Sequence, residues 1–95
     1  MMRLCRHEAI QRIARLNGWS LEGDAIRMQY TFPSFADAIA FVNRLAPEAD
    51  KADHHPDILV SYKRVTLTYS THSEGGLTAK DFAGAEVADA AAGVR

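Results

Sequence analysis

Two spacings of hydrophobic residues alternate along this chain. Apolar residues recur every three or four positions over about residues 7–16 and 35–46, a spacing typical of amphipathic helices. They alternate with polar residues over 26–32, 58–62 and 65–69, as in half-buried strands, and residues 19–21 are a shorter strand candidate. With a last helix from about residue 78, the order is α-β-β-α-β-β-α. Short connections then predict an α+β fold, a four-stranded antiparallel sheet with three helices packed on one face.

Polar residues mark where two of these helices begin. Ser34 precedes the second helical segment and has Asp37 three positions later, which is a weaker form of the capping box. Thr78 and Asp81 repeat this arrangement at the start of the last helix. Pro47 either kinks the second helix or starts another turn, so the pattern leaves the end of that helix open.

The length and charge of the chain narrow the classes of protein it can belong to. Its 95 residues fit a single domain over 1–95, and so short a chain has a thin stability margin that oligomerisation would widen. Eleven basic and twelve acidic residues give a formal charge of −1, which argues against a general nucleic-acid binder.

Cysteine content and hydropathy indicate the compartment. Cys5 is the only cysteine, so neither an intrachain disulfide nor a multi-cysteine metal site is expected. The sequence has neither a signal-peptide core nor the roughly 18 consecutive apolar residues that span a bilayer. We therefore expect a cytoplasmic protein without a membrane segment.

The second pair of strands carries the most informative residues, because histidines flank it. With Lys63 and Arg64 at the hairpin tip, opposed residues have numbers that sum to 127, and every apolar residue meets an apolar partner. The apolar pairs are Tyr62 with Val65, Val60 with Leu67, and Ile58 with Tyr69. The same register places His55 opposite His72 on the polar face of the sheet, so that both imidazoles could contact one small ligand. We also expect Asp81, in the first turn of the last helix, to lie near His72 and orient its ring.

Several kinds of chemistry are compatible with three such histidines. A metal site would use histidine ligands, but His54 and His55 are adjacent and would point to opposite faces of a strand, and no established ligand spacing is present. A nucleophilic triad is disfavoured because Cys5 is remote and no Gly-x-Ser-x-Gly motif exists. General acid–base catalysis fits better, because histidine exchanges protons near neutral pH. A purely structural role for the histidines remains an alternative.

The motifs of the second half resemble one enzyme family. The His54-His55-Pro56 triplet, together with Thr-His-x-x-x-Gly-Leu-Thr-x-x-Asp over residues 71–81, is similar to the pterin-4a-carbinolamine dehydratases. The resemblance extends from about Trp19 to Ala85. Two departures are visible, since Asp50 stands where members often carry Glu and Ile58 stands where an aromatic residue sometimes occurs.

This resemblance implies a reaction and a site. The family removes water from 4a-hydroxytetrahydrobiopterin or a related pterin, gives the quinonoid dihydropterin, and needs neither a metal nor an organic cofactor. By analogy His54, His55 and His72 surround the pterin ring, with His54 and His72 as the acid–base candidates. Pro56 would contribute to the binding site, and Asp81 would support it.

The resemblance also implies partners. The reaction regenerates the cofactor of aromatic amino acid hydroxylases, which suggests a functional link to such an enzyme, and the family forms homodimers and homotetramers. Some relatives act as dimerisation cofactors of transcription factors. A non-catalytic protein-binding module is therefore the alternative function, and it would use helix surfaces and not the histidines.

Overall fold

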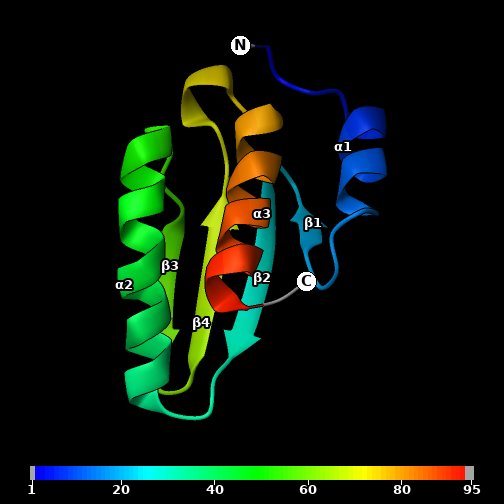
Figure 1. Cartoon of the computed structure of the whole chain (residues 1–95). Coiled ribbons are helices and arrows are strands. Elements are labelled where there is room, and N and C mark those ends of the chain that lie inside the picture. The colour runs from blue at the N-terminus through cyan, green and yellow to red at the C-terminus, as the bar shows by residue number, and fades with distance from the viewer. Residues whose placement is uncertain (1, 94–95) are drawn as a thin grey trace.

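The predicted order of helices and strands is confirmed. The computed structural model describes residues 2–93, and Figure 1 shows their arrangement. The elements are α1 (Arg6–Ile13), β1 (Ser20–Glu22), β2 (Ala25–Thr31), α2 (Phe35–Ala52), β3 (Asp57–Ser61), β4 (Arg64–Tyr69), the short 3-10 helix η1 (His72–Glu74) and α3 (Ala79–Ala92). The strands form one antiparallel sheet in the order β1-β2-β4-β3. The fold is therefore the α+β class that the hydrophobic pattern predicts.

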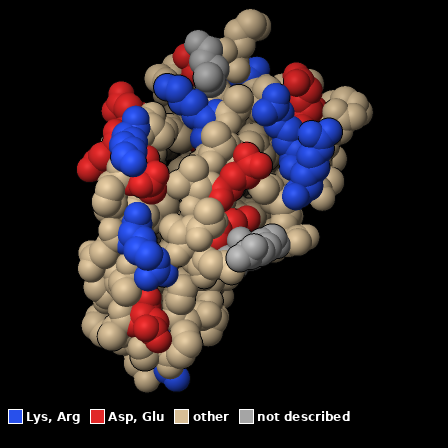
Figure 2. All heavy atoms as spheres, viewed as in Figure 1, with Lys and Arg blue, Asp and Glu red and all other residues tan. Residues whose placement is uncertain are grey.

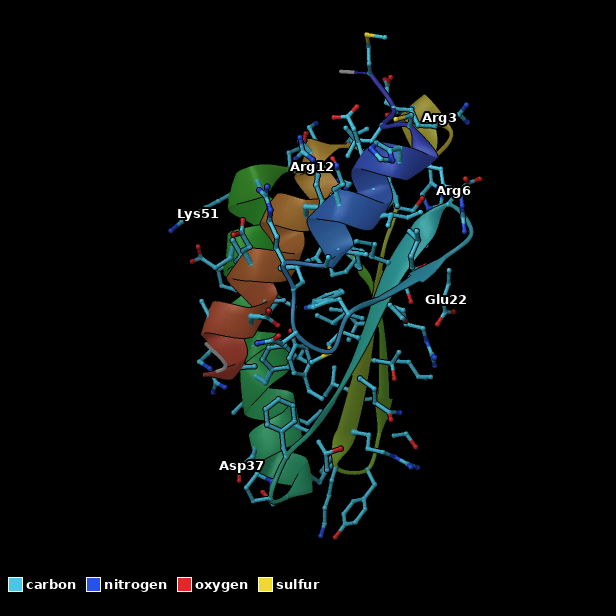
Figure 3. The ribbon with its side chains drawn as sticks, turned by 90° about the vertical axis from the view of Figure 1, so that its right-hand side faces the viewer. Arg3, Arg6, Arg12, Glu22, Asp37 and Lys51 are labelled. Atoms are coloured by element: carbon cyan, nitrogen blue, oxygen red, sulfur yellow. The ribbon has the colours of Figure 1, made fainter. Side chains whose placement is uncertain are left out.

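The hydrophobic core lies between the sheet and its helices. Figure 3 shows the helices on one side of the sheet, while the opposite face of β2 and β4 is left uncovered by helix. The central strand β4 contributes Val65, Leu67 and Tyr69, all nearly inaccessible to solvent, and α2 contributes Phe41 and Leu45. These residues follow the alternation of a strand and the spacing of a helix, so the core explains why the two patterns alternate along the chain.

Helix α2 runs through Pro47. Ser34 caps the helix as predicted, because its side chain accepts a hydrogen bond from the Asp37 backbone N–H at 3.1 Å. The helix then continues to Ala52, since Leu45 and Ala49 on either side of the proline are buried against the core. Within residues 2–93, neither α2 nor another helix is long and apolar enough to cross a membrane.

Two aspartates anchor α3 near its two ends. At the start, Thr78 and Asp81 form the predicted capping box, with the Asp81 carboxylate accepting the Thr78 backbone N–H at 3.0 Å. Toward the other end, Asp89 accepts hydrogen bonds from the Trp19 indole N–H and the Tyr30 hydroxyl. Helix α3 is therefore fixed to the sheet by polar contacts as well as by apolar packing.

The predicted register of the second hairpin is wrong by two positions. The observed pairs sum to 125, so Ile58 faces Leu67 and Val60 faces Val65, and the tip consists of Tyr62 and Lys63. A shift of two residues keeps every side chain on its own face of the sheet, so the apolar pattern is compatible with both registers. The ladder between β3 and β4 ends at Asp57 and Thr68, and His72 lies beyond it in η1. His55 and His72 are therefore not cross-strand partners.

The observed hairpin tip makes a prediction about stability. Tyr62 has a left-handed backbone (φ 54°), which asparagine adopts more readily than tyrosine, whereas Lys63 has none of this strain. We expect Tyr62→Asn to raise the free energy of unfolding by about 0.5–1 kcal/mol, measured by urea denaturation. Lys63→Asn is the matched control and should give no gain. A gain from Lys63→Asn alone would favour a tip at Lys63 and Arg64 instead.

Candidate functional site

The chain between α2 and β3 sets the positions of the two adjacent histidines. After Ala52, Asp53 adopts a left-handed conformation (φ 51°) that ends the helix, and the His54 backbone N–H donates to the Ala49 carbonyl at 3.2 Å. Pro56 then favours an extended conformation at His55 and leads into β3. The two side chains consequently leave the backbone in different directions and meet different surroundings.

His54 is the buried member of the pair. Its Nε2 lies 2.6 Å from Oδ1 of Asp81, and its side chain is 12% exposed while that of Asp81 is fully buried. The imidazole also stacks on the Tyr69 ring, with centroids 5.8 Å apart and planes inclined by 22°. Because an aspartate side chain, a tyrosine ring and the end of α2 all constrain it, His54 is held in one orientation.

Asp81 also holds two threonines. Its second oxygen, Oδ2, accepts the Thr71 hydroxyl at 2.8 Å and the Thr78 backbone N–H at 3.0 Å. The Thr71 and Thr78 hydroxyl oxygens lie 2.8 Å apart, and both threonines are buried. Within residues 2–93, no buried side-chain nitrogen or oxygen is left without a hydrogen-bond partner. Burial of the Asp81 carboxylate is therefore compensated by a complete set of donors.

This arrangement assigns the tautomer of the neutral His54 ring. A carboxylate can only accept, so the proton of the His54–Asp81 bond lies on Nε2. The neutral imidazole then carries its lone pair on Nδ1. A proton can therefore be accepted at Nδ1 of His54, and Asp81 would stabilise the imidazolium that results.

His55 and His72 lie in more exposed surroundings. His55 Nε2 is 2.9 Å from Oδ1 of Asp50, with side chains 56% and 77% exposed, so solvent and salt screen this pair. Figure 2 shows acidic side chains around a basic one over the C-terminal end of α2, where Asp50 and Lys51 lie. His72 is exposed at the start of η1.

The structure places His54 and His72 at different pockets. His54 lines an apolar pocket of about 110 Å³ between α2 and α3. His72 lines a separate, shallower pocket of about 330 Å³ together with Asp57, Thr68 and Ser70. The expected contact of Asp81 with the His72 ring is wrong, because the carboxylate forms its histidine hydrogen bond with His54. Among residues 2–93, no three histidine, cysteine or acidic side chains are grouped so as to hold a metal ion.

Comparison with known proteins gives the family of this chain. Residues 2–91 match the family described as pterin 4 alpha carbinolamine dehydratase. The chain belongs to this family. One relative, from Sulfolobus acidocaldarius, is 44% identical over 81 residues, which cover 85% of this chain and 89% of the relative. Another, from Mycobacteroides abscessus, is 51% identical over 77 residues, covering 81% and 82%. Both carry the name "Putative pterin-4-alpha-carbinolamine dehydratase".

Solved structures share the fold of this dehydratase-family chain. The crystal structure of a transcriptional coactivator/pterin dehydratase from Brucella melitensis has a TM-score of 0.90 and 37% identity, and the match covers 95% of this chain and 98% of that one. A pterin dehydratase-like protein identified as a RuBisCO assembly factor in the alpha-carboxysome has a TM-score of 0.68 and 24% identity, with coverages of 81% and 89%. The second likeness concerns the fold alone.

Sequence reasoning missed two residues of the candidate site. Tyr69 has the alternation of a core residue, and nothing in the pattern indicates that its ring also supports His54. Thr71 is part of the family-like Thr-His pair, but its buried hydroxyl contact with Asp81 depends on how α3 docks onto β4. That docking is close at Gly84, where an added Cβ would come within 2.6 Å of the Tyr69 ring. A larger residue at position 84 would argue against this close contact between α3 and β4, whereas glycine permits it.

Tyr69, which stacks on His54, has a hydroxyl group whose pKa is shifted by burial. Burial first, and the nearby Asp81 charge second, raise the pKa of Tyr69 to about 12. Burial and the Asp89 hydrogen bond also raise the pKa of Tyr30. In both cases the neutral form is favoured in the folded chain.

This shift predicts a loss of stability in alkali. Between pH 10 and 12 the unfolded chain loses the Tyr69 proton while the folded chain keeps it, so the free energy of unfolding falls as pH rises. Tyr69→Phe should reduce this slope by up to about 1 kcal/mol per pH unit, measured by urea denaturation from pH 8 to 11.5. Tyr62→Phe, at an exposed tyrosine, is the control and should leave the slope unchanged. An unchanged slope in Tyr69→Phe would contradict the assignment.

Proposed function

We propose that this chain dehydrates a 4a-hydroxytetrahydropterin to the quinonoid dihydropterin by histidine acid–base catalysis. The observation that carries the proposal is the buried His54–Asp81 pair, which gives one histidine of the motif a fixed orientation and a defined tautomer. Membership in the pterin 4 alpha carbinolamine dehydratase family supports the choice of substrate. The proposal covers the class of substrate and does not extend to the side chain that the pterin carries.

The reaction needs one acid and one base. The C4a–O bond breaks as an imidazolium donates a proton to the departing hydroxyl, which leaves as water. A neutral imidazole accepts the proton from N5, and the electron pair of the N5–H bond forms the C4a=N5 double bond. Atoms and charges balance without an oxidant, a metal or an organic cofactor.

We assign the base to His54 and the acid to His72. The Asp81 bond leaves the His54 lone pair at Nδ1 and stabilises the ring once it is protonated, as a carboxylate partner does for a catalytic histidine. His72 is exposed and can exchange protons with solvent between turnovers. Because the two rings line different pockets, the proposal requires the His72 ring to turn toward the pterin when it binds. His55 and Pro56 would bind and orient the substrate.

The proposed physiological role follows from the product. The quinonoid dihydropterin is the form from which a tetrahydropterin is regenerated, so the chain would support an aromatic amino acid hydroxylase or a similar pterin-dependent enzyme. We further propose that it acts as a homodimer or homotetramer, because so short a chain gains stability from additional buried surface. Neither nucleic acid nor membrane takes part in this role.

A non-catalytic, protein-binding role is the second candidate. It is favoured by the solved structure at 37% identity, whose description names both a transcriptional coactivator and a pterin dehydratase. Such a role would depend on helix surfaces and would not require the His54–Asp81 pair. Substitution of the histidines therefore separates the two functions.

Histidine variants test the dehydratase proposal. Wild-type chain should accelerate the disappearance of a 4a-hydroxytetrahydropterin over buffer, followed by ultraviolet absorbance. His54→Ala and His72→Ala should each lower kcat by about 100-fold or more, because each removes one proton-transfer group. His7→Ala, at an exposed histidine of α1, is the matched control and should keep full activity.

Two outcomes would contradict the proposal. A wild-type rate no faster than buffer would exclude dehydratase activity and favour the binding role. Full activity in both His54→Ala and His72→Ala, with circular dichroism spectra like that of the wild type, would show that the assigned histidines do not catalyse the reaction.

A further inference from the structure

Thr71 lies where the surroundings of the two assigned catalytic histidines meet. Its hydroxyl donates to Oδ2 of Asp81 at 2.8 Å, and the other oxygen of that carboxylate binds His54. The next residue in the chain is His72. Thr71 is 6% exposed, so water does not compete effectively for these contacts. One buried hydroxyl group therefore joins the His54 support to the segment that carries His72.

The hydrogen atoms of this network can be placed one by one. The Lys80 backbone N–H donates to the Thr78 hydroxyl oxygen at 3.3 Å. A hydroxyl group has a single hydrogen, and that of Thr71 is given to Asp81, so Thr78 must donate to Thr71 across their 2.8 Å contact. The result is a directed chain of hydrogen bonds from the first turn of α3 through Thr78 and Thr71 to Asp81. Each bond in such a chain strengthens its neighbours.

The backbone of Thr71 holds the base of the loop that carries His72. Its N–H donates to the Gly76 carbonyl at 3.1 Å, and its carbonyl accepts from the Gly76 N–H at 3.3 Å and from the Glu74 N–H at 3.0 Å. The loop over residues 72–75 is thus closed at Thr71. Because both the backbone and the side chain of Thr71 are fixed, the position from which His72 projects is fixed relative to Asp81.

We propose that Thr71 is a positioning residue that couples the placement of His72 to that of His54 through the Asp81 carboxylate. The inference rests on the proposed dehydratase function for its catalytic meaning. Loss of the hydroxyl would remove one donor from Asp81 and leave Thr78 without its acceptor. Both histidines would then lose part of their support, although Thr71 touches neither imidazole in the hydrogen-bond network and donates no proton to the substrate.

Three variants separate positioning from a simple loss of stability. Thr71→Val keeps the branched shape and removes the hydroxyl, whereas Thr71→Ser keeps the hydroxyl. Thr66→Val is the matched control. Thr66 is a buried threonine of β4 whose hydroxyl oxygen accepts a hydrogen bond from the Gln29 side chain, and it lies outside the Asp81 network. Thr71→Val should lower kcat by about tenfold or more with KM within about twofold, since proton transfer depends on placement. Thr71→Ser should recover most of the rate, and Thr66→Val should match the wild type.

Nuclear magnetic resonance of the imidazole nitrogens gives a readout that does not need turnover. Thr71→Val should shift the ¹⁵N signals of both His54 and His72, whereas Thr66→Val should shift neither. If the wild type has no dehydratase activity, the proposed function fails, yet these signals still decide whether Thr71 couples the two rings. If Thr71→Val does not fold, Thr71→Ala, which introduces no new contact, takes its place with the same readouts.

The coupling would be overturned by either of two results. One is a Thr71→Val chain with wild-type kcat and unshifted signals from both rings. The other is a Thr71→Ser chain as impaired as Thr71→Val, because the methyl group and not the hydroxyl would then be the part that matters.

Discussion

The Asp81 carboxylate is the group on which the candidate site depends. It is fully buried, and an ionised carboxylate in that position is costly unless each oxygen has donors. Here one oxygen binds His54, and the other binds the Thr71 hydroxyl and the Thr78 backbone N–H. These partners lie just after α2, just after β4 and at the start of α3. The carboxylate that caps α3 is therefore also the group that orients a candidate catalytic histidine.

Much of the fold could be predicted from the sequence, because it follows from local patterns. The alternation over 26–32, 58–62 and 65–69 and the caps at Ser34 and Thr78 are all realised. Register was harder, because a shift of two positions preserves the faces of the sheet and changes only the residues at the turn. In the observed register Tyr62 lies at the turn in a left-handed conformation, which is uncommon for tyrosine and is not indicated by the sequence pattern.

The error in register explains which part of the site could not be predicted. Once the ladder ends at Asp57 and Thr68, His72 falls in a loop, and the proposed contact with His55 has no basis. Asp81 was recognised as part of the motif, but its partner depends on the close approach of α3 to β4 at Gly84 and Tyr69. Contacts of this kind, between segments far apart in the sequence, depend on tertiary packing. Neither periodicity nor capping patterns predict them.

The adjacent histidines show how the fold gives identical residues different properties. His54 is buried, stacked on Tyr69 and paired with a buried aspartate, whereas His55 is exposed and paired with exposed Asp50. The first pair has a low dielectric environment and fixed geometry, and the second is screened by water. In the proposed mechanism, the first environment suits proton transfer and the second suits contact with the substrate.

The most direct test of this account is the tautomer of His54, measured from its imidazole ¹⁵N signals in the wild type and in Asp81→Asn. The account predicts a wild-type neutral ring protonated at Nε2. It also predicts a change in this pattern in Asp81→Asn, because an amide cannot accept at both of the positions that the carboxylate oxygens occupy. A wild-type ring protonated at Nδ1, or identical His54 signals in the two chains, would contradict the central role of Asp81.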